Sequence, residues 1–114
     1  MPFIDVKTTA VVTDEKASCV KSALGKAISV IPGKSEGWLM VEIEPEKKIW
    51  FRGDNSADSA MVTVAVYGSL SDRDAAKMTG EITKILEEYL EIDPDRTYVS
   101  YSEHDKWGWN GSNF

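Results

Sequence analysis

The chain has 114 residues, of which 42% are hydrophobic and 28% are charged. These proportions are typical of a soluble globular protein and exclude a disordered or fibrous chain. The formal net charge is -6, from 13 basic and 19 acidic residues, which argues against nucleic acid as a partner because nucleic-acid binders carry a basic surface. We therefore expect a single acidic domain spanning residues 1–114.

The composition also limits membrane, metal and redox functions. No apolar run approaches the roughly 20 residues that a bilayer-spanning helix needs. Charged residues interrupt positions 1–16, where a secretory signal would be apolar. We therefore expect a cytoplasmic protein, whose export would need a route without a signal peptide. Cys19 is the single cysteine and His104 the single histidine, which excludes an intramolecular disulfide and argues against a zinc site.

The first half of the chain predicts a strand, a helix and a second strand. Residues 2–9 are β-branched and bounded by turn residues, which is typical of a strand. Thr13 or Asp14 can cap a following helix, which Pro32–Gly33 ends. Apolar residues of residues 38–44 alternate with period two, which predicts the second strand. The apolar stripe of the helix consists of Val20, Leu24, Ala27, Ile28 and Ile31.

The second half of the chain repeats this order of elements. Residues 61–67 form a continuous apolar run of strand length, which we expect to be covered on both faces. Ser71 and Asp74 fit a capping box at the start of a helix. Residues 92–96 read as a turn and residues 97–102 as the last strand. The apolar stripe of this second helix consists of Ala75, Met78, Ile82, Ile85, Leu86 and Tyr89.

The repeated order indicates an internal duplication. Strand, helix and strand begin near positions 3, 14 and 38, and again near 60, 72 and 97. This spacing predicts an α/β (α+β) fold, a tandem βαβ pseudo-repeat of about residues 1–57 and 58–114. Right-handed crossovers place both helices on one face of a four-stranded mixed sheet. Apolar residues in both phases of the strands then leave a bare apolar face, which another copy of the chain would cover most simply.

Four features, in this order, resemble the macrophage migration inhibitory factor (MIF) family of the tautomerase superfamily. They are the N-terminal MP, a GK after the first helix, DPDRTYVSY, and the closing GWNGSNF. The resemblance covers nearly the whole chain. It implies the tautomerase/MIF fold, assembled as a homotrimer with active sites between subunits. It also implies an isomerase without cofactor or metal, which interconverts the keto and enol forms of 2-keto acids such as phenylpyruvate.

The resemblance assigns roles to individual residues. Pro2 matches the catalytic base, because its nitrogen becomes a secondary amine once Met1 is removed. Burial and a nearby cation lower the pKa of such an amine and leave part of it free to take a proton from carbon. Lys34 matches the lysine that binds the substrate carboxylate. Tyr67 lies where the family uses a strand-end backbone N–H for that carboxylate, and Tyr98 matches a ring contributed by the neighbouring subunit.

The remaining candidate residues line the expected pocket. Phe3, Trp107 and Phe114 are expected to supply apolar walls around the amine, and Trp38 falls where the family places a ring at the pocket edge. Ser100 stands at the position of the family's substrate-binding asparagine and is a shorter group with one donor. We therefore expect a small aromatic 2-keto acid as substrate, with a preference and rate that the Ser100 and Tyr67 differences alter.

Simpler interpretations remain open for several of these residues. Pro2 taken alone indicates only easy methionine removal. Lys34 also suits the C-terminal end of a helix, where the dipole favours a cation, and Tyr67 suits a packed face of a sheet. Trp107 and Trp109 suit packing at an oligomer interface as well as they suit a pocket wall.

Two other functions compete with the tautomerase. One is a MIF-like cytokine or cytokine mimic that binds a host receptor and keeps a vestigial pocket. The other is dehalogenation or decarboxylation on the same proline, which we rank last. Members with those activities usually carry extra arginines near the pocket, and this chain has only Arg52, Arg73 and Arg96. Residues 59–62 read SAMV in place of the CxxC pair of vertebrate members, so we expect no thiol-oxidoreductase activity.

Overall fold

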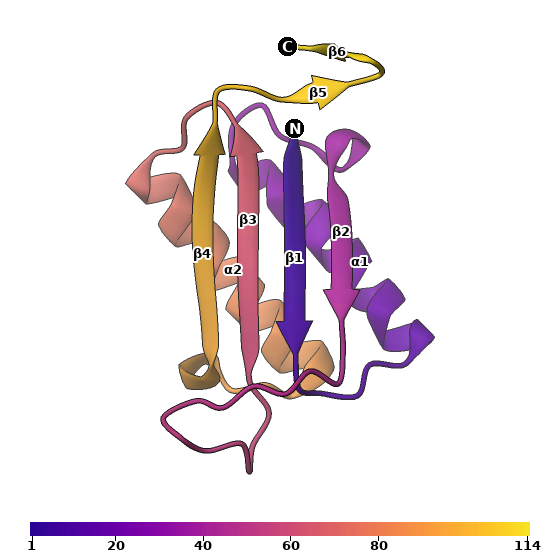
Figure 1. Cartoon of the computed structure of the whole chain (residues 1–114), viewed down its shortest axis with the longest axis vertical. Coiled ribbons are helices and arrows are strands. Elements are labelled where there is room, and N and C mark those ends of the chain that lie inside the picture. The colour runs from indigo at the N-terminus through magenta and orange to yellow at the C-terminus, as the bar shows by residue number, and fades with distance from the viewer.

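The computed structural model describes all 114 residues and shows two successive βαβ units (Figure 1). The corresponding strands and helices of the two units begin 58, 58 and 57 positions apart. The first unit comprises β1 (Pro2–Thr8), α1 (Asp14–Ala27) and β2 (Met40–Glu44), and the second comprises β3 (Ala60–Tyr67), α2 (Asp72–Leu90) and β4 (Thr97–His104). The predicted tandem repeat of elements is confirmed.

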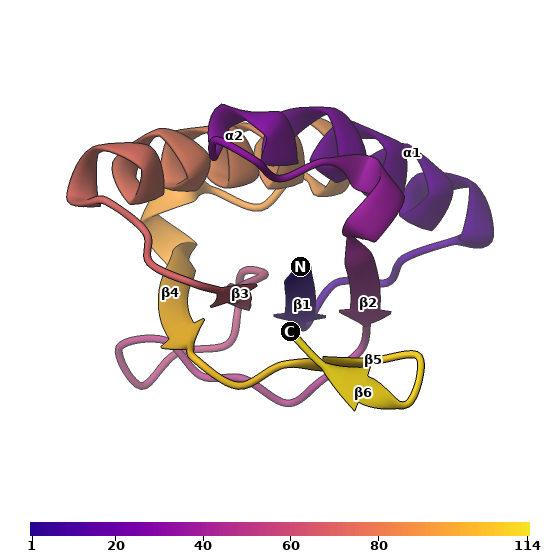
Figure 2. The ribbon, with the colours of Figure 1, turned by 90° about the horizontal axis from the view of Figure 1, so that it is seen from above.

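The strands form one mixed sheet in the order β2-β1-β3-β4. Strand β1 pairs in parallel with β2 and antiparallel with β3, and β3 pairs in parallel with β4. Both helices cover the same face of this sheet, as the view from above shows (Figure 2). The predicted four-stranded mixed sheet with two helices on one face is therefore confirmed. Neither helix combines the length and the apolar character required to cross a bilayer.

Local capping explains where the helices begin. The side chain of Thr13 accepts a hydrogen bond from the backbone N–H of Lys16 at 3.2 Å, and that of Ser71 accepts one from Asp74 at 3.1 Å. Each bond satisfies one of the backbone donors that the first turn of a helix leaves unpaired. Helix α1 ends at Ala27, earlier than predicted, and the short 3₁₀ segment η1 (Ile28–Val30) continues it toward Pro32.

The core lies between the helices and one face of the sheet. Alternate residues of β3 are fully buried there, and the apolar stripes of both helices pack against them. This alternation follows from the period of a β-strand, in which successive side chains point to opposite faces. The wholly buried side chains of this layer include Ile4, Val6, Val20, Leu24, Ile28, Val62, Val64, Val66, Met78, Ile82 and Leu86.

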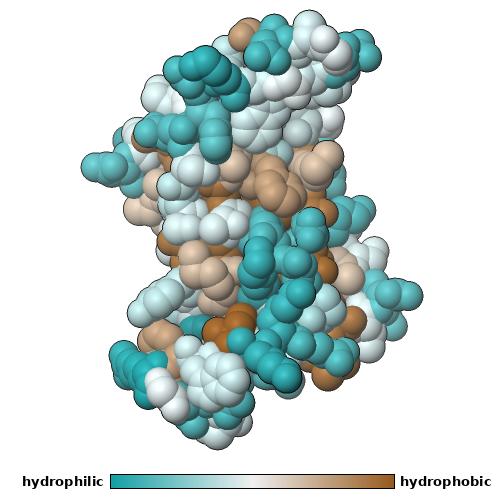
Figure 3. Space-filling view, viewed as in Figure 1, coloured by the Kyte–Doolittle hydropathy of each residue, from teal (hydrophilic) through white to brown (hydrophobic).

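The other face of the sheet is only partly covered within the chain. Met61 and Ala65 are half-buried, Thr63 between them is exposed, and Tyr98 on β4 is 62% exposed. Figure 3 views this open face and shows apolar patches beside a hydrophilic band. Within one chain residues 61–67 are covered on one face only, because the helices shield only one phase of β3, and the covering of the other face by another copy stays a prediction.

The hydrophilic part of the open face includes a cluster of carboxylates on β1 and β2. Asp5, Glu42 and Glu44 bring one oxygen each within 4.8 Å of one another. The ammonium of Lys7 contacts the Asp5 carboxylate and lies 3.0 Å from that of Glu44, and Lys47 lies 3.7 Å from Glu44. The hydrogen bonds that the Lys7 ammonium donates to the carboxylates of Asp5 and Glu44 raise the pKa of Lys7. The two lysines thus supply positive charge within the cluster.

Two segments differ from the predictions in ways that affect the site. Trp38, expected to begin the second strand, lies instead in the 3₁₀ turn η2 (Glu36–Trp38), in which the N–H of Leu39 bonds to the carbonyl of Glu36 at 3.1 Å. The C-terminal tail forms a hairpin of β5 (Gly108–Trp109) and β6 (Ser112–Asn113). Figure 1 shows this hairpin across the end of the sheet at which β1 begins.

Candidate active site

Lys34 is placed by a tight turn that follows the first helical segment. The backbone N–H of Lys34 bonds to the carbonyl of Ile31 at 3.1 Å, with Pro32 and Gly33 between them. Gly33 has a φ of 79°, so the turn is type II, in which the third position requires the left-handed region that glycine adopts without strain. This turn directs the half-buried Lys34 side chain to the end of β3, where its ammonium donates a 2.8 Å hydrogen bond to the carbonyl of Tyr67.

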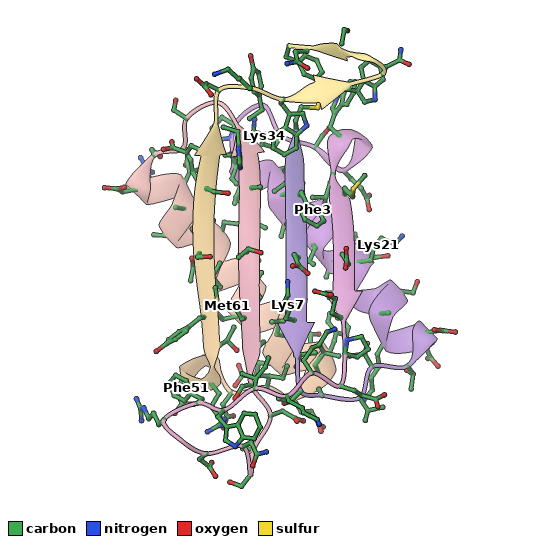
Figure 4. The ribbon with its side chains drawn as sticks, viewed as in Figure 1. Phe3, Lys7, Lys21, Lys34, Phe51 and Met61 are labelled. Carbon is green, nitrogen blue, oxygen red and sulfur yellow. The ribbon has the colours of Figure 1, made fainter.

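The start of the chain meets Lys34 at the same place. Pro2, the first residue of β1, is buried and lies opposite Val66 of β3. The carbonyl of Met1 accepts a 3.0 Å hydrogen bond from the backbone N–H of Tyr67. Burial, followed by the charge of Lys34 and a hydrogen bond with it, lowers the pKa of the amine on Met1. Figure 4 shows Lys34 at this end of the sheet, near the start of β1.

A cleft of about 280 Å³ opens beside Pro2. Its walls come from the start of β1, from η2 and the start of β2, and from the C-terminal tail. The lining residues are Met1, Pro2, Phe3, Gly37, Trp38, Leu39, Met40, Trp107, Gly108 and Trp109. Two larger hollows lie elsewhere, one of about 360 Å³ between α1 and α2 and one of about 400 Å³ beside Gly68 and His104. Neither of these is lined by Pro2, so the smaller cleft is the better candidate for proton-transfer chemistry.

A chain of aromatic contacts fixes the tail over this cleft. The ring of Trp38 meets that of Trp109 edge-on at 5.0 Å, and Trp109 stacks on Phe114 at 6.3 Å. Phe114 in turn packs against the ring of Tyr67 at 5.7 Å, and its backbone N–H bonds to the carbonyl of Trp107 at 3.0 Å. Ring pairs at such separations are favourable, so these contacts hold the tail against η2 and the end of β3.

Trp109, like Trp107, lines the cleft, although its place in the sequence suited interface packing equally well. Its position follows from the two-residue turn of the hairpin, in which Asn110 and Gly111 have φ values of 52° and 83°. An Asn-Gly pair is a strong hairpin signal because both residues tolerate the left-handed region that a type I′ turn requires. That signal predicts the hairpin and therefore which rings lie together.

The structure brings seven of the predicted site residues to one end of the sheet. Four of them line the cleft, and the others lie beside it through the contacts above. The four are Pro2, Phe3, Trp38 and Trp107, and the adjoining residues are Lys34, Tyr67 and Phe114.

The other two predicted residues, Tyr98 and Ser100, lie apart from this group within the chain. They occupy the open face of β4 opposite Met61 and Thr63, whereas Pro2 lies opposite Val66. At the rise of a strand, Met61 lies about 17 Å and Thr63 about 10 Å from Val66 along β3. Tyr98 and Ser100 therefore do not reach the cleft of their own chain.

Comparison with known proteins agrees with this geometry. A sequence model of the macrophage migration inhibitory factor (MIF) family matches residues 1–114, the whole chain. The chain belongs to the MIF family. The resemblance inferred from the ordered motifs is confirmed, and the two-helix, four-stranded architecture is the tautomerase fold of MIF proteins.

Solved structures of MIF proteins superpose over nearly the full length. MIF2 of Leishmania major is 29% identical with a TM-score of 0.93, over 100% of this chain and 97% of that protein. A MIF homologue of Prochlorococcus marinus is 24% identical with a TM-score of 0.86, over 98% of both chains. Pt0534, whose structure was determined after inactivation by 2-oxo-3-pentynoate, shares the fold at 14% identity with a TM-score of 0.84, over 96% of this chain and 93% of its own.

Proposed function

We propose that this MIF protein is a cofactor-free keto–enol tautomerase, an isomerase acting on phenylpyruvate-like 2-keto acids. The observation that carries the proposal is the meeting of the chain's first residues, the Lys34 ammonium and the backbone of Tyr67 at the mouth of an aromatic cleft. Burial and the charge of Lys34 lower the pKa of the amine on Met1, and we expect the same surroundings to lower that of the Pro2 amine once Met1 is removed. An amine that is partly uncharged near neutral pH is suited to general-base catalysis.

Removal of Met1 would expose two groups at once. It converts the amide nitrogen of Pro2 into a secondary amine with a lone pair. It also frees the backbone N–H of Tyr67, which the Met1 carbonyl now occupies at 3.0 Å. The Met1 carbonyl oxygen therefore marks where an oxygen of the substrate carboxylate would bind, at the N–H of the residue whose carbonyl accepts a hydrogen bond from the Lys34 ammonium.

The proposed reaction transfers one proton between carbon and oxygen of the substrate. The nitrogen of Pro2 takes a proton from C3 of the keto acid, the C–H electron pair forms the C2–C3 double bond, and the carbonyl π pair moves to the oxygen. The Pro2 ammonium then gives its proton to that oxygen, which completes the enol and restores the amine. Lys34 and the Tyr67 N–H hold the carboxylate throughout, and the rings of Trp38 and Trp107 exclude water.

The site needs a second copy of the chain to be complete. Tyr98 and Ser100 are remote from the cleft of their own chain, and the face of the sheet that carries them is largely uncovered. We place both residues at the cleft of a neighbouring copy within a homotrimer. There the Ser100 hydroxyl donates to the enol oxygen and the Tyr98 ring contacts the substrate.

Covalent labelling with 2-oxo-3-pentynoate tests the role of the amine. This reagent is a 2-keto acid whose C3≡C4 triple bond is conjugated with the carbonyl, so the lone pair of Pro2 can attack C4, the alkyne carbon farther from that carbonyl. A new N–C bond forms, one π bond of the alkyne breaks, and the proton of the amine moves to the adjacent carbon. We expect one adduct per mature chain, with the full mass of the reagent, on the peptide that begins at Pro2.

Two control samples sharpen the labelling experiment. Protein that retains Met1, produced with methionine aminopeptidase inhibited, has no amine on Pro2 and is expected to give no Pro2 adduct. Lys34→Ala is expected to label more slowly because the reagent's carboxylate loses its cation. Mass spectrometry that finds no adduct on Pro2, or adducts spread over surface lysines at the same rate, would contradict the proposal.

A second candidate function is the binding of a host receptor, as a MIF-like cytokine or cytokine mimic. The observation that favours it is the exposure of the rings around the cleft, with Trp38 at 45%, Trp109 at 53% and Phe114 at 50%, since exposed aromatic residues are enriched in protein interfaces. The form that retains Met1 separates the two functions. Receptor binding would survive in that form, whereas catalysis would be lost.

A further inference from the structure

A rigid turn lies at the end of the sheet opposite the cleft. The backbones of Phe51 and Asp54 exchange hydrogen bonds of 2.8 and 3.0 Å, and the two residues between them, Arg52 and Gly53, have φ values of 54° and 75°. These values are typical of a type I′ turn. The side chain of Asp54 also accepts hydrogen bonds from the backbone and the hydroxyl of Ser56. The turn is therefore held by its own contacts.

Arg96 fastens this turn to the start of β4. Its guanidinium donates to the carbonyls of Asp54 and Asp58, each at 3.0 Å, and to the hydroxyl of Ser59 at 3.1 Å. The same group lies 5.5 Å from the centre of the Phe51 ring, and that of Arg52 lies 5.0 Å from it. A cation over a ring face is attracted by the ring quadrupole. The Phe51 ring is thereby fixed in place.

The edge of the Phe51 ring meets the ring of Tyr98. Their centres lie 5.4 Å apart with the planes at 80°, the edge-to-face arrangement that aromatic pairs favour. Tyr98 is otherwise 62% exposed, and an exposed side chain ordinarily samples several rotamers. Figure 4 shows Phe51 and Met61 together at this end of the sheet, away from Lys34. The contacts around Arg96 thus immobilise a tyrosine ring that remains open to the surroundings.

We propose that Phe51 is a positioning residue, which holds the Tyr98 ring in the orientation that the neighbouring copy's cleft requires. This inference rests on the proposed function, because it assumes that Tyr98 completes that cleft. A ring that is already ordered loses little conformational entropy when substrate binds. Loss of the Phe51 ring therefore weakens substrate binding and leaves the proton transfer at Pro2 unchanged.

The test compares variants at position 51 in phenylpyruvate tautomerisation. Phe51→Leu keeps a large apolar side chain but removes the ring edge. We expect its KM to rise about fivefold with kcat unchanged, which corresponds to the interaction free energy of one aromatic pair. Phe51→Tyr restores a ring and is expected to return KM to the wild-type value. Trp50→Ala, at a 58% exposed neighbouring position, is the matched control and is expected to behave as wild type.

A double-mutant cycle with Tyr98→Ala decides whether Phe51 acts through Tyr98. We expect Phe51→Leu to cause no further rise in KM once Tyr98 is removed, because the ring that Phe51 positions is then gone. Multiplying effects in the double variant would overturn the inference, and so would a wild-type KM for Phe51→Leu. If sedimentation shows that Phe51→Leu fails to assemble, Phe51→Met is used in its place with the same two criteria.

Different results would reject the positioning role of Phe51 and the proposed tautomerase activity. Wild-type KM and kcat in Tyr98→Ala would overturn the role of Phe51 while leaving the chemistry at Pro2 intact. Equal kcat for wild type and Pro2→Gly would instead reject the proposed function itself.

Discussion

Pro2→Gly is expected to lower kcat for phenylpyruvate tautomerisation by about 100-fold, the lower end of what one general base contributes. Glycine leaves a primary amine at the mature N-terminus, but that amine is more flexible and more solvated than the proline nitrogen in β1. Fewer molecules then carry a free lone pair aimed at the substrate. The measurement is the enol–keto conversion of phenylpyruvate, followed by absorbance in wild type and variant.

Pro45→Gly provides the matched control for this substitution. Pro45 follows β2 and lies outside the residues that line the cleft, so its replacement by glycine is expected to leave kcat at the wild-type level. Protein that retains Met1 gives the complementary result. Its proline nitrogen is an amide without a basic lone pair, and its Tyr67 N–H is occupied, so we expect no measurable catalysis. A kcat in Pro2→Gly equal to that of wild type would reject the account of catalysis.

Lys34→Ala is expected to raise KM for phenylpyruvate at least about tenfold, because a charge-assisted hydrogen bond to the substrate carboxylate is lost. The same change removes the cation that lowers the pKa of the Met1 amine and that we expect to act in the same way on the Pro2 amine of the mature chain. The amine pKa therefore rises, a smaller fraction is free at a given pH, and the acid limb of the kcat/KM profile moves to higher pH. Steady-state kinetics across pH measure both effects.

Lys21→Ala is the matched control for the lysine substitution. Lys21 lies exposed on α1, away from the cleft (Figure 4), so KM and the pH profile are expected to remain those of wild type. An unchanged KM in Lys34→Ala would contradict the assignment of Lys34 to the substrate carboxylate. A raised KM with an unmoved acid limb would contradict the electrostatic coupling between Lys34 and the amine.

The periodic parts of the chain could be predicted because burial on one face leaves a pattern in the sequence. The stripe through Leu24 and Ile28 in the first helical segment and the apolar phase of Val62, Val64 and Val66 both follow this rule. The turn before Lys34 could also be predicted, since a Pro-Gly pair after a helix is typical of a tight turn. The meeting of Lys34 with the start of β1 was implied only by the resemblance to the MIF family, because a local turn does not determine a long-range contact.

Other features depend on contacts that periodicity does not encode. Met61 and Ala65 of β3 are apolar although they lie on the face of the sheet that no helix of the chain covers. A role for Tyr98 and Ser100 in the site likewise requires that another copy of the chain lies against β4. The 3₁₀ turn at Trp38 and the hairpin that carries Trp109 arise from short-range backbone chemistry and aromatic packing. The Asn-Gly pair was the one local signal for the hairpin.

The uncharged state of the N-terminal amine is the condition on which the proposed chemistry depends. Titration of the ¹⁵N-labelled Pro2 nitrogen in the mature chain, by NMR in wild type and in Lys34→Ala, measures it directly. In wild type we expect the pKa of the Pro2 amine to lie well below the ordinary value of an N-terminal amine. In Lys34→Ala we expect that pKa to be higher. An ordinary pKa that is the same in both proteins would contradict the proposed chemistry.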